Sequence, residues 1–205
     1  MAMKIVIATL NRDKFQQIQD ILKDVPVELI PSYECDIPKS ENPGPSFVEK
    51  ALIKARHAAK CTGLPSIADD TGLTVDALGG APGIHSSHYA GLHTSEAANR
   101  EKVLKAIVNL EGNERAARYY CAIAFVVHAA DPMPIICQAH WEGLLLKAPS
   151  AGTVGYGYDS IFYVPEHRCT VAELTQAQLN QYSPRARAFR KLATHLPSLN
   201  SASND

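Results

Sequence analysis

Hydrophobic and polar positions along the chain follow two periods, which predict strands and helices in succession. A short apolar run at Lys4–Ala8 predicts a buried strand, and Val27–Ile30 predicts a weaker one. A longer stretch rich in β-branched and aromatic residues at Arg118–His128 predicts a strand that pairs antiparallel, after a proline-containing turn, with Ile135–Leu146. Shorter strands are expected at Ser66–Ala68 and Ile161–Val164.

Five segments carry apolar side chains at helical spacing. Asn11 can cap the first helix, whose apolar face begins at Phe15. Ser46 and Glu49 form a capping box for the second helix, which Gly63 ends. The remaining helices are expected at Ser95–Leu110 with Val103, Leu104, Ile107 and Val108 inward, at Val171–Leu179, and after Ser183 and Pro184 with Phe189, Leu192, Ala193 and Leu196 inward.

This order of elements predicts an α/β fold with a central mixed sheet flanked by helices. We expect two lobes with the active-site cleft between them, because such clefts bind small ligands. The length of 205 residues fits one large domain, which we place at residues 1–197. Residues 198–205 are polar and are expected to form a flexible tail.

Composition narrows the class of protein. The net charge of −1 gives no basic field that would recruit a nucleic-acid polymer, and no stretch approaches the ~18 apolar residues of a membrane span. Five cysteines without a Cys-x-x-Cys pair favour free thiols in a reduced, cytoplasmic setting. The spacing of His85, His88 and His93 does not predict a zinc site either.

Two adjacent carboxylates, Asp69 and Asp70, follow the predicted strand Ser66–Ala68. Neighbouring side chains at a strand end point to opposite faces, so one can face a cleft while the other turns into the scaffold. A glycine-rich loop then runs to Ser86, and clustered glycines let a backbone approach a ligand closely. Carboxylates prefer hard cations such as Mg²⁺, which in turn bind phosphates. The stretch predicts a metal–phosphate site, although the same residues are also ordinary turn formers.

A strand-to-helix turn at Thr9–Lys14 is a candidate phosphate site. The start of a helix offers backbone N–H groups and positive partial charge, and Lys14 adds a full charge. The turn lacks the glycines and the Lys-Ser/Thr pair of a Walker loop. Glu41 is a candidate second carboxylate for a metal shared with Asp70.

Two further segments could contact a nucleotide. Lys50 and Lys54 lie one helical turn apart and can face the same way, although a solvated face is the simpler interpretation of Lys50. The loop at Gly155–Asp159 places tyrosines among glycines, which suits stacking on a base. Arg185, in the first turn of the last helix, can hydrogen-bond a base carbonyl or a phosphate.

The most specific motifs are Ala55-Arg-His-Ala-Ala-Lys60, Ile67-Ala-Asp-Asp-Thr-Gly-Leu73, Gly79-Gly-Ala-Pro-Gly-Ile84 and Gly155-Tyr-Gly-Tyr-Asp159. In this order they resemble the inosine/xanthosine triphosphate pyrophosphatase family, over nearly the whole chain. The resemblance implies an elongated two-lobed α/β fold and a homodimer. It also implies Mg²⁺-dependent cleavage of nucleoside triphosphates such as ITP, dITP and XTP to the monophosphate and pyrophosphate, which cleans the nucleotide pool.

The resemblance also implies roles for individual residues. Glu41 and Asp70 would hold Mg²⁺, and Asp70 or the metal would activate a water for attack on phosphorus. The substrate-binding residues would be Thr9, Asn11, Lys14, Thr71, Tyr156, Gly157, Tyr158, Asp159 and Arg185.

Five positions depart from the family pattern: Leu10 stands in place of glycine, Lys50 of asparagine, His88 of arginine, Leu179 of lysine and Pro184 of histidine. The metal and catalytic carboxylates are retained, so we predict retained metal chemistry with altered or relaxed base choice. Two alternatives stay open. One is a related pyrophosphatase with another substrate, such as a modified pyrimidine triphosphate; the other is a weakly catalytic paralogue that binds nucleotides as a sensor or dimer partner.

Overall fold

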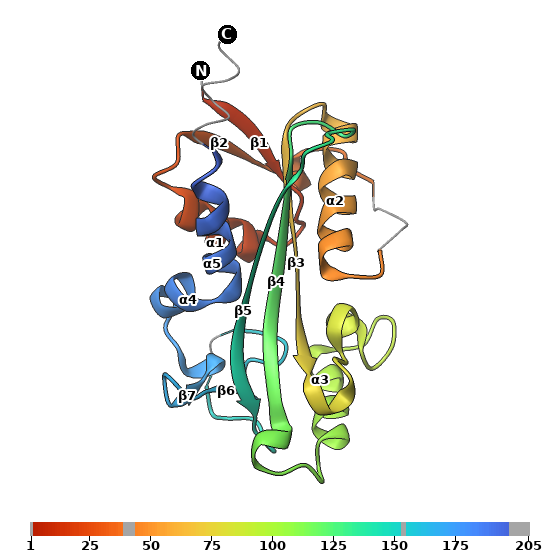
Figure 1. Cartoon of the computed structure of the whole chain (residues 1–205), viewed down its shortest axis with the longest axis vertical. Helices are drawn as coiled ribbons and strands as arrows, with labels where there is room; N and C mark the ends of the chain where they lie inside the picture. Colours follow the sequence, from red (N-terminus) through yellow and green to blue (C-terminus); the bar gives the residue numbers. More distant parts are fainter. Residues whose placement is uncertain (1, 39–43, 153–154, 197–205) are drawn as a thin grey trace. The chain divides into compact units, whose positions relative to one another are not determined.

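The structure is a computed structural model that describes residues 2–38, 44–152 and 155–196. Its strands form one seven-stranded sheet in the order β2-β1-β3-β4-β5-β6-β7 (Figure 1). β1 pairs parallel with β2 and β3, whereas β6 pairs antiparallel with β5 and β7, so the predicted mixed sheet is confirmed. The strands are β1 (Met3–Ile7), β2 (Val27–Pro31), β3 (Ser66–Val75), β4 (Ala116–Val126), β5 (Ile135–Leu145), β6 (Phe162–Val164) and β7 (Cys169–Thr170).

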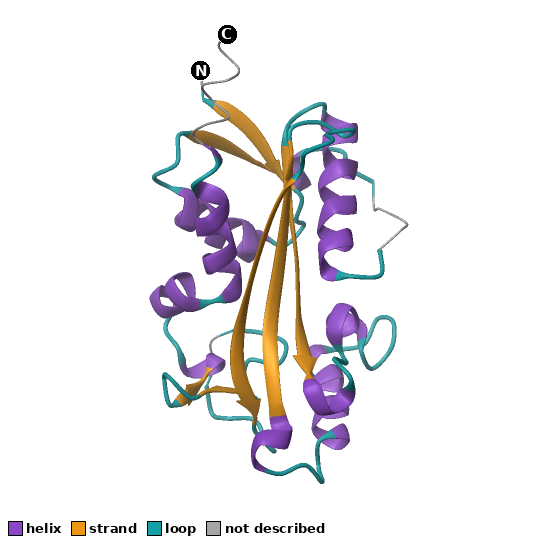
Figure 2. Cartoon of the chain, in the orientation of Figure 1, coloured by secondary structure: helices purple, strands orange, loops and turns teal. Residues whose placement is uncertain are grey.

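Helices separate the first four strands along the chain, whereas β4 to β7 follow one another and the last two α-helices come after β7 (Figure 2). Asn11 caps the first helix by accepting the N–H of Lys14, and Ser46 caps the second by accepting the N–H of Glu49. Gly63 ends the second helix in the left-handed region, at φ 69°. The α-helices are α1 (Arg12–Leu22), α2 (Phe47–Thr62), α3 (Glu96–Ala106), α4 (Gln176–Tyr182) and α5 (Pro184–Ala193).

The chain forms two compact units. Unit 1 comprises Met1–Asp70, Cys121–Ala139 and Arg185–Asp205, and unit 2 comprises Thr71–Tyr120 and His140–Pro184. β3, β4 and β5 each contribute residues to both units. The predicted tail at 198–205 lies outside the described residues.

In unit 1, alternate residues of one strand face different layers of core. Ile67 of β3 packs in a cluster with Phe15 and Ile18 of α1 and Phe189 of α5. The next residue, Ala68, packs in a second cluster with small side chains of α2. Because successive strand side chains point to opposite faces, α1 and α5 cover one face of β3 and α2 covers the other, as Figure 1 shows.

Unit 2 has its own core. Leu73 and Val75 of β3 pack with Val103 of α3, with Ile107 directly after that helix, and with the single tryptophan, Trp141. α3 ends earlier than predicted: Ile107 is its C-cap, and Val108, which we expected to face inward, is 59% exposed.

Two other predicted elements are corrected by the structure. β3 runs on to Val75, so Asp69 and Asp70 lie within a strand rather than at its end. The single helix expected at Val171–Leu179 is a 3₁₀ turn at Val171–Glu173 followed by α4, because Thr175 forms a capping box that starts a new helix. In the described part of the chain, no helix is long and apolar enough to cross a bilayer.

Candidate active site

The pleat of β3 separates the two adjacent carboxylates. Asp69 continues the face of Ile67, toward α1 and α5, and Asp70 continues the face of Ala68, toward α2. The side chain of Asp69 is 3% exposed and that of Asp70 is 13% exposed. Each carboxylate therefore forms its ion pairs with a different layer of helices.

Asp69 is the centre of a buried charge network. Its Oδ2 lies 3.2 Å from Nε of Arg185 on α5 and 3.8 Å from Nζ of Lys14 on α1. Arg185 is itself buried, and its Nη1 donates to Oε1 of Gln17 at 2.8 Å. Burial alone would raise the pKa of Asp69, but Lys14, Arg185 and Lys54 outweigh it and hold that pKa well below its ordinary value. Asp69 is a charged carboxylate that ties α1 and α5 to β3.

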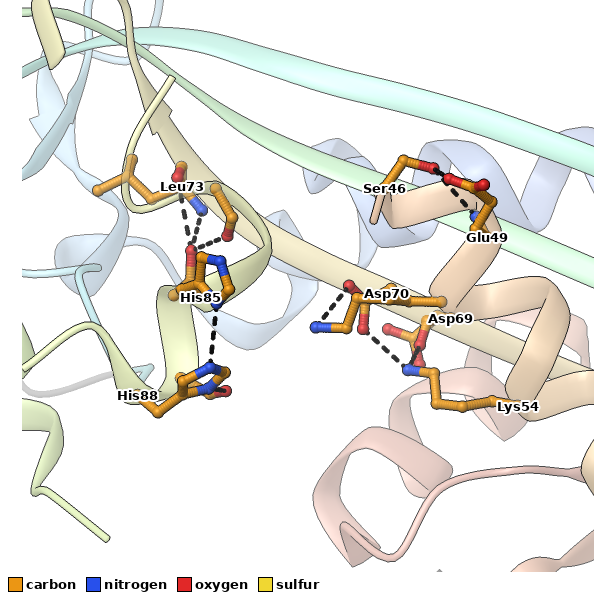
Figure 3. Close-up of polar contacts among 12 residues, drawn as sticks. Ser46, Glu49, Lys54, Asp69, Asp70, Leu73, His85 and His88 are labelled. Carbon is orange, nitrogen blue, oxygen red and sulfur yellow. Dashed lines mark hydrogen bonds and ion pairs between the residues drawn. The ribbon is translucent and has the colours of Figure 1, made fainter. Parts of the chain in front are cut away.

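Asp70 lies between two lysines of α2, Lys50 and Lys54. Figure 3 labels Asp70 and Lys54 and marks their contact with a dashed line. Nζ of Lys54 donates to Oδ1 of Asp70 at 2.9 Å and also to the backbone carbonyl of Asp69. Nζ of Lys50 lies 3.5 Å from Oδ2 of Asp70, and the Lys50 side chain is only 16% exposed. The expectation that Lys50 lies on a solvated face is therefore wrong, because its ammonium is attracted to the partly buried carboxylate of Asp70.

The turn before α1, the candidate phosphate site, is held by three side-chain hydrogen bonds. Oγ1 of Thr9 accepts the backbone N–H of Asn11 at 3.2 Å, and Oδ1 of Asn11 accepts that of Lys14 at 3.0 Å. Oγ of Ser32 donates to the carbonyl of Thr9 at 2.7 Å, which fixes the turn against the chain after β2. Leu10, at the position of the family's glycine, is 75% exposed. These bonds shape a helix start with the charge of Lys14 beside it.

In unit 2, the tyrosine–glycine loop is fixed by hydrogen bonds to its own carboxylate and to α3. Oδ2 of Asp159 accepts the N–H of Tyr156 at 2.8 Å, and Oδ1 accepts the hydroxyl of Tyr119 at 2.7 Å. Burial, then the charge of Asp159, raises the pKa of Tyr119 well above its ordinary value. Gly157 donates to Oε2 of Glu96 at 2.8 Å and accepts from Nη1 of Arg100 at 2.8 Å.

The two tyrosines of this loop differ in exposure. Tyr158 is buried in the core of unit 2, its hydroxyl donates to the carbonyl of Ser86 at 2.8 Å, and burial raises its pKa. Tyr156 is 49% exposed. Of the two rings, only that of Tyr156 offers a large surface to a base.

The glycine-rich segment after β3 folds back on that strand. The N–H of Leu73 donates to Oγ of Ser86 at 2.9 Å, and Oγ of Ser86 donates to the carbonyl of Gly83 at 2.6 Å. In the same segment, Nδ1 of His85 lies 3.2 Å from Nε2 of His88, so the two imidazoles share a hydrogen bond (Figure 3). His88 therefore contacts another histidine at the position where the family pattern has arginine.

The structure thus places the predicted residues in two groups. Thr9, Asn11, Lys14, Asp70 and Arg185 belong to unit 1, whereas Thr71, Tyr156, Gly157, Tyr158 and Asp159 belong to unit 2. Glu41 lies outside the described residues. Sequence reasoning missed the contacts of Gln17, Glu96, Arg100 and Tyr119, and no local motif marks these residues.

The chemistry of Asp70 suits a hard cation. Mg²⁺ binds through one or two carboxylates, keeps several waters and takes up substrate phosphates, so it does not need a cage of protein ligands. Among the described residues, no group of three or more His, Cys, Asp or Glu side chains could hold a metal ion. A metal at this site would depend on Asp70, on Glu41 and on phosphate and water oxygens.

Comparison with known proteins gives a consistent assignment. The Ham1 family model matches residues 5–195. The chain is 47% identical over 189 residues to a dITP/XTP pyrophosphatase of Vibrio cholerae, covering 92% of this chain and 94% of the relative. A HAM1 protein from Coxiella burnetii has a TM-score of 0.90 at 44% identity, covering 96% of this chain and 99% of that one. The Staphylococcus aureus Ham1 protein has a TM-score of 0.84 at 36% identity, covering 95% and 98%. The motifs, the mixed sheet and these relatives agree, and the chain belongs to the Ham1 family.

Proposed function

We propose that this protein hydrolyses non-canonical purine nucleoside triphosphates, such as dITP, ITP and XTP, to the monophosphate and pyrophosphate. The observation that carries the proposal is Asp70, a carboxylate on the α2 face of β3 with a lysine at each oxygen. Relatives named dITP/XTP pyrophosphatase, which match more than nine-tenths of the chain, support the substrate class.

In this mechanism, unit 1 binds the triphosphate. The first turn of α1 presents backbone N–H groups, and Lys14 adds a charge that Asp69 holds in place at 3.8 Å. Asp70, with Glu41, would hold Mg²⁺; when bound, the metal neutralises phosphate charge and lowers the pKa of a water. Asp70 accepts a proton from the attacking water, and Lys54 keeps its carboxylate oriented.

In unit 2, the Tyr156–Asp159 loop is the candidate for binding the base. Tyr156 offers an exposed ring, and Asp159 holds the loop in shape through its bonds to Tyr119 and to the N–H of Tyr156. Thr71, which follows Asp70 in β3, is a further candidate substrate contact. The guanidinium of Arg185 donates hydrogen bonds to Asp69 and Gln17, which gives it a structural role. The proposed contact of Arg185 with the base would be a second role.

The test is pyrophosphate release across a panel of triphosphates: dITP, ITP and XTP beside the four standard ribonucleotides and dUTP. We expect Asp70→Asn to lower kcat at least ~100-fold, within the range of a general base. Asp20→Asn, an exposed carboxylate on α1 that accepts from Gln16, is the matched control and should turn over normally. Full activity of the Asp70 variant would refute the mechanism.

A second candidate is the same chemistry with a shifted choice of base. Leu179, where the family pattern has lysine, is 9% exposed and packs in the core of unit 2, so it supplies no charge to a substrate. Pro184, in place of histidine, is the first residue of α5 and lacks a side-chain donor. Preference for another triphosphate in the panel would favour this candidate, and release from none would favour the nucleotide-binding paralogue.

We also infer that the protein forms a homodimer, as the resemblance implies. Within each protomer we infer a single domain over residues 1–197. Light scattering measures the mass in solution, and a single cooperative unfolding transition would support one domain.

A further inference from the structure

One face of α3 holds the tyrosine–glycine loop, Gly155–Asp159, at a single residue. The N–H of Gly157 donates to Oε2 of Glu96 at 2.8 Å, and its carbonyl accepts from Nη1 of Arg100 at 2.8 Å. Glu96 and Arg100 are four positions apart on the helix, so they lie on the same face. Hydrogen bonds to charged side chains are stronger than neutral ones. α3 therefore fixes the loop through the backbone of Gly157.

Other contacts fix the later part of the loop. The ring of Tyr158 is buried in the core of unit 2, and Asp159 accepts the hydroxyl of Tyr119. Asp159 also accepts the N–H of Tyr156, which shapes the turn from within. Gly157, at φ 65° in the left-handed region that favours glycine, directly follows the exposed Tyr156. The contact with α3 thus lies next to the ring that is available to a base.

α3 is itself firmly placed in unit 2. Val103 is fully buried in the core of that unit. The buried Asn99 accepts the N–H of Ala90 at 2.7 Å and donates to the carbonyl of Ser87 at 3.1 Å. A binding loop that is bonded to a well-packed helix is held more precisely than one that is held by loop contacts alone.

We propose that Glu96 and Arg100 are positioning residues for the base, because they fix Gly157 and thereby hold the ring of Tyr156 where a base can stack on it. The inference rests on the proposed function, since it takes this loop as the base-binding segment. Binding groups must stay within about 0.5 Å of their productive positions. Loss of either contact should therefore weaken binding of the base and leave binding of the triphosphate unchanged.

The experiment separates the base from the triphosphate without turnover. Calorimetry measures the binding of α,β-methylene dITP, which cannot be cleaved at the proposed bond, and of inorganic triphosphate, which has no base, both with Mg²⁺ in the buffer. We expect Glu96→Ala and Arg100→Met each to bind the dITP analogue about tenfold more weakly, which is the scale of one lost hydrogen bond. Both variants should bind inorganic triphosphate within about twofold of the parent protein.

A conservative variant distinguishes positioning from a general effect of the charge at position 96. Glu96→Gln keeps a side-chain oxygen that can accept the N–H of Gly157, so its affinity for the dITP analogue should stay near that of the parent. Circular dichroism at the assay temperature checks that each variant is folded.

Two matched controls make the same substitutions elsewhere on α3. Glu101→Ala removes a carboxylate from an exposed ion pair with Lys105. Lys102→Met removes a donor to the backbone carbonyl of Tyr89, a bond of the same kind as that of Arg100 but to another segment. Both controls should bind the two ligands as the parent does.

Unchanged affinity for the dITP analogue in both test variants would overturn the proposal, as would an equal loss of affinity for inorganic triphosphate. So would a loss in Glu96→Gln as large as in Glu96→Ala, equal losses in the controls, or a parent protein that gains no affinity from the base. These measurements do not depend on hydrolysis. A protein inactive on the whole nucleotide panel can still pass this test, and an active one can fail it.

Discussion

Replacing Asp69 with asparagine should destabilise the protein more than removing an ordinary ion pair. Oδ2 of Asp69 lies 3.2 Å from Arg185 and 3.8 Å from Lys14. At an effective dielectric constant of about 20, these contacts give attractions of about 5 and about 4 kcal/mol. Desolvation of the buried ions offsets several kcal/mol, and the variant leaves Arg185 buried without its carboxylate, so we expect a net loss of about 3–5 kcal/mol.

The assay is urea unfolding at pH 7 followed by far-ultraviolet circular dichroism, which reports on all helices and strands. The matched control is Asp76→Asn. Oδ1 of Asp76 lies only 2.5 Å from Nη1 of Arg118, but the two side chains are 48% and 40% exposed. Solvent screening should limit that loss to about 0.2–1 kcal/mol despite the shorter distance. Equal losses in the two variants would refute the reasoning that burial, rather than distance, sets the strength of these pairs.

Two further predictions concern other carboxylates. Asp131→Ala should cost about 1–3 kcal/mol at pH 7, because the buried Asp131 accepts the N–H groups of Val127 and Met133. These bonds outweigh burial and lower the pKa of Asp131, so its contribution is present above pH ~4 and is lost as the pH falls further. Urea unfolding should therefore show parent and variant converging below pH ~4, and a constant gap would contradict this. Tyr119→Phe should cost about 1–2 kcal/mol, measured by tryptophan fluorescence in urea, because it removes a donor to Asp159; no loss would mean that water replaces the hydroxyl.

Local signals in the sequence predicted the features that depend on neighbouring residues. Asn11 and Ser46 cap their helices, and Gly63 ends one, because each acts on backbone groups within four positions of itself. The division of Asp69 and Asp70 between two faces follows from the pleat of any strand. These predictions needed no knowledge of the tertiary structure.

The partners of these residues could not be predicted in the same way. Asp69 and Arg185 are 116 positions apart, and Tyr119 and Asp159 are 40 apart, so no periodicity links them. The end of β3 was misplaced for a related reason. Carboxylates are poor strand formers, and within β3 the charges of Asp69 and Asp70 are balanced by cations from α1, α2 and α5 that the local sequence does not reveal.

In the proposed mechanism, the register of β3 therefore decides which carboxylate serves the scaffold and which serves the reaction. Both residues are aspartates in one strand, and each has lysine partners. Asp69 also has a buried arginine that cannot lose its charge, whereas the ion pairs of Asp70 within the described residues are with lysines. A guanidinium fixed by Gln17 makes a permanent contact. An ammonium group on a flexible four-carbon stem is less strictly oriented than a planar guanidinium. A shift of one residue would reverse these assignments, because every side chain of the strand would change face.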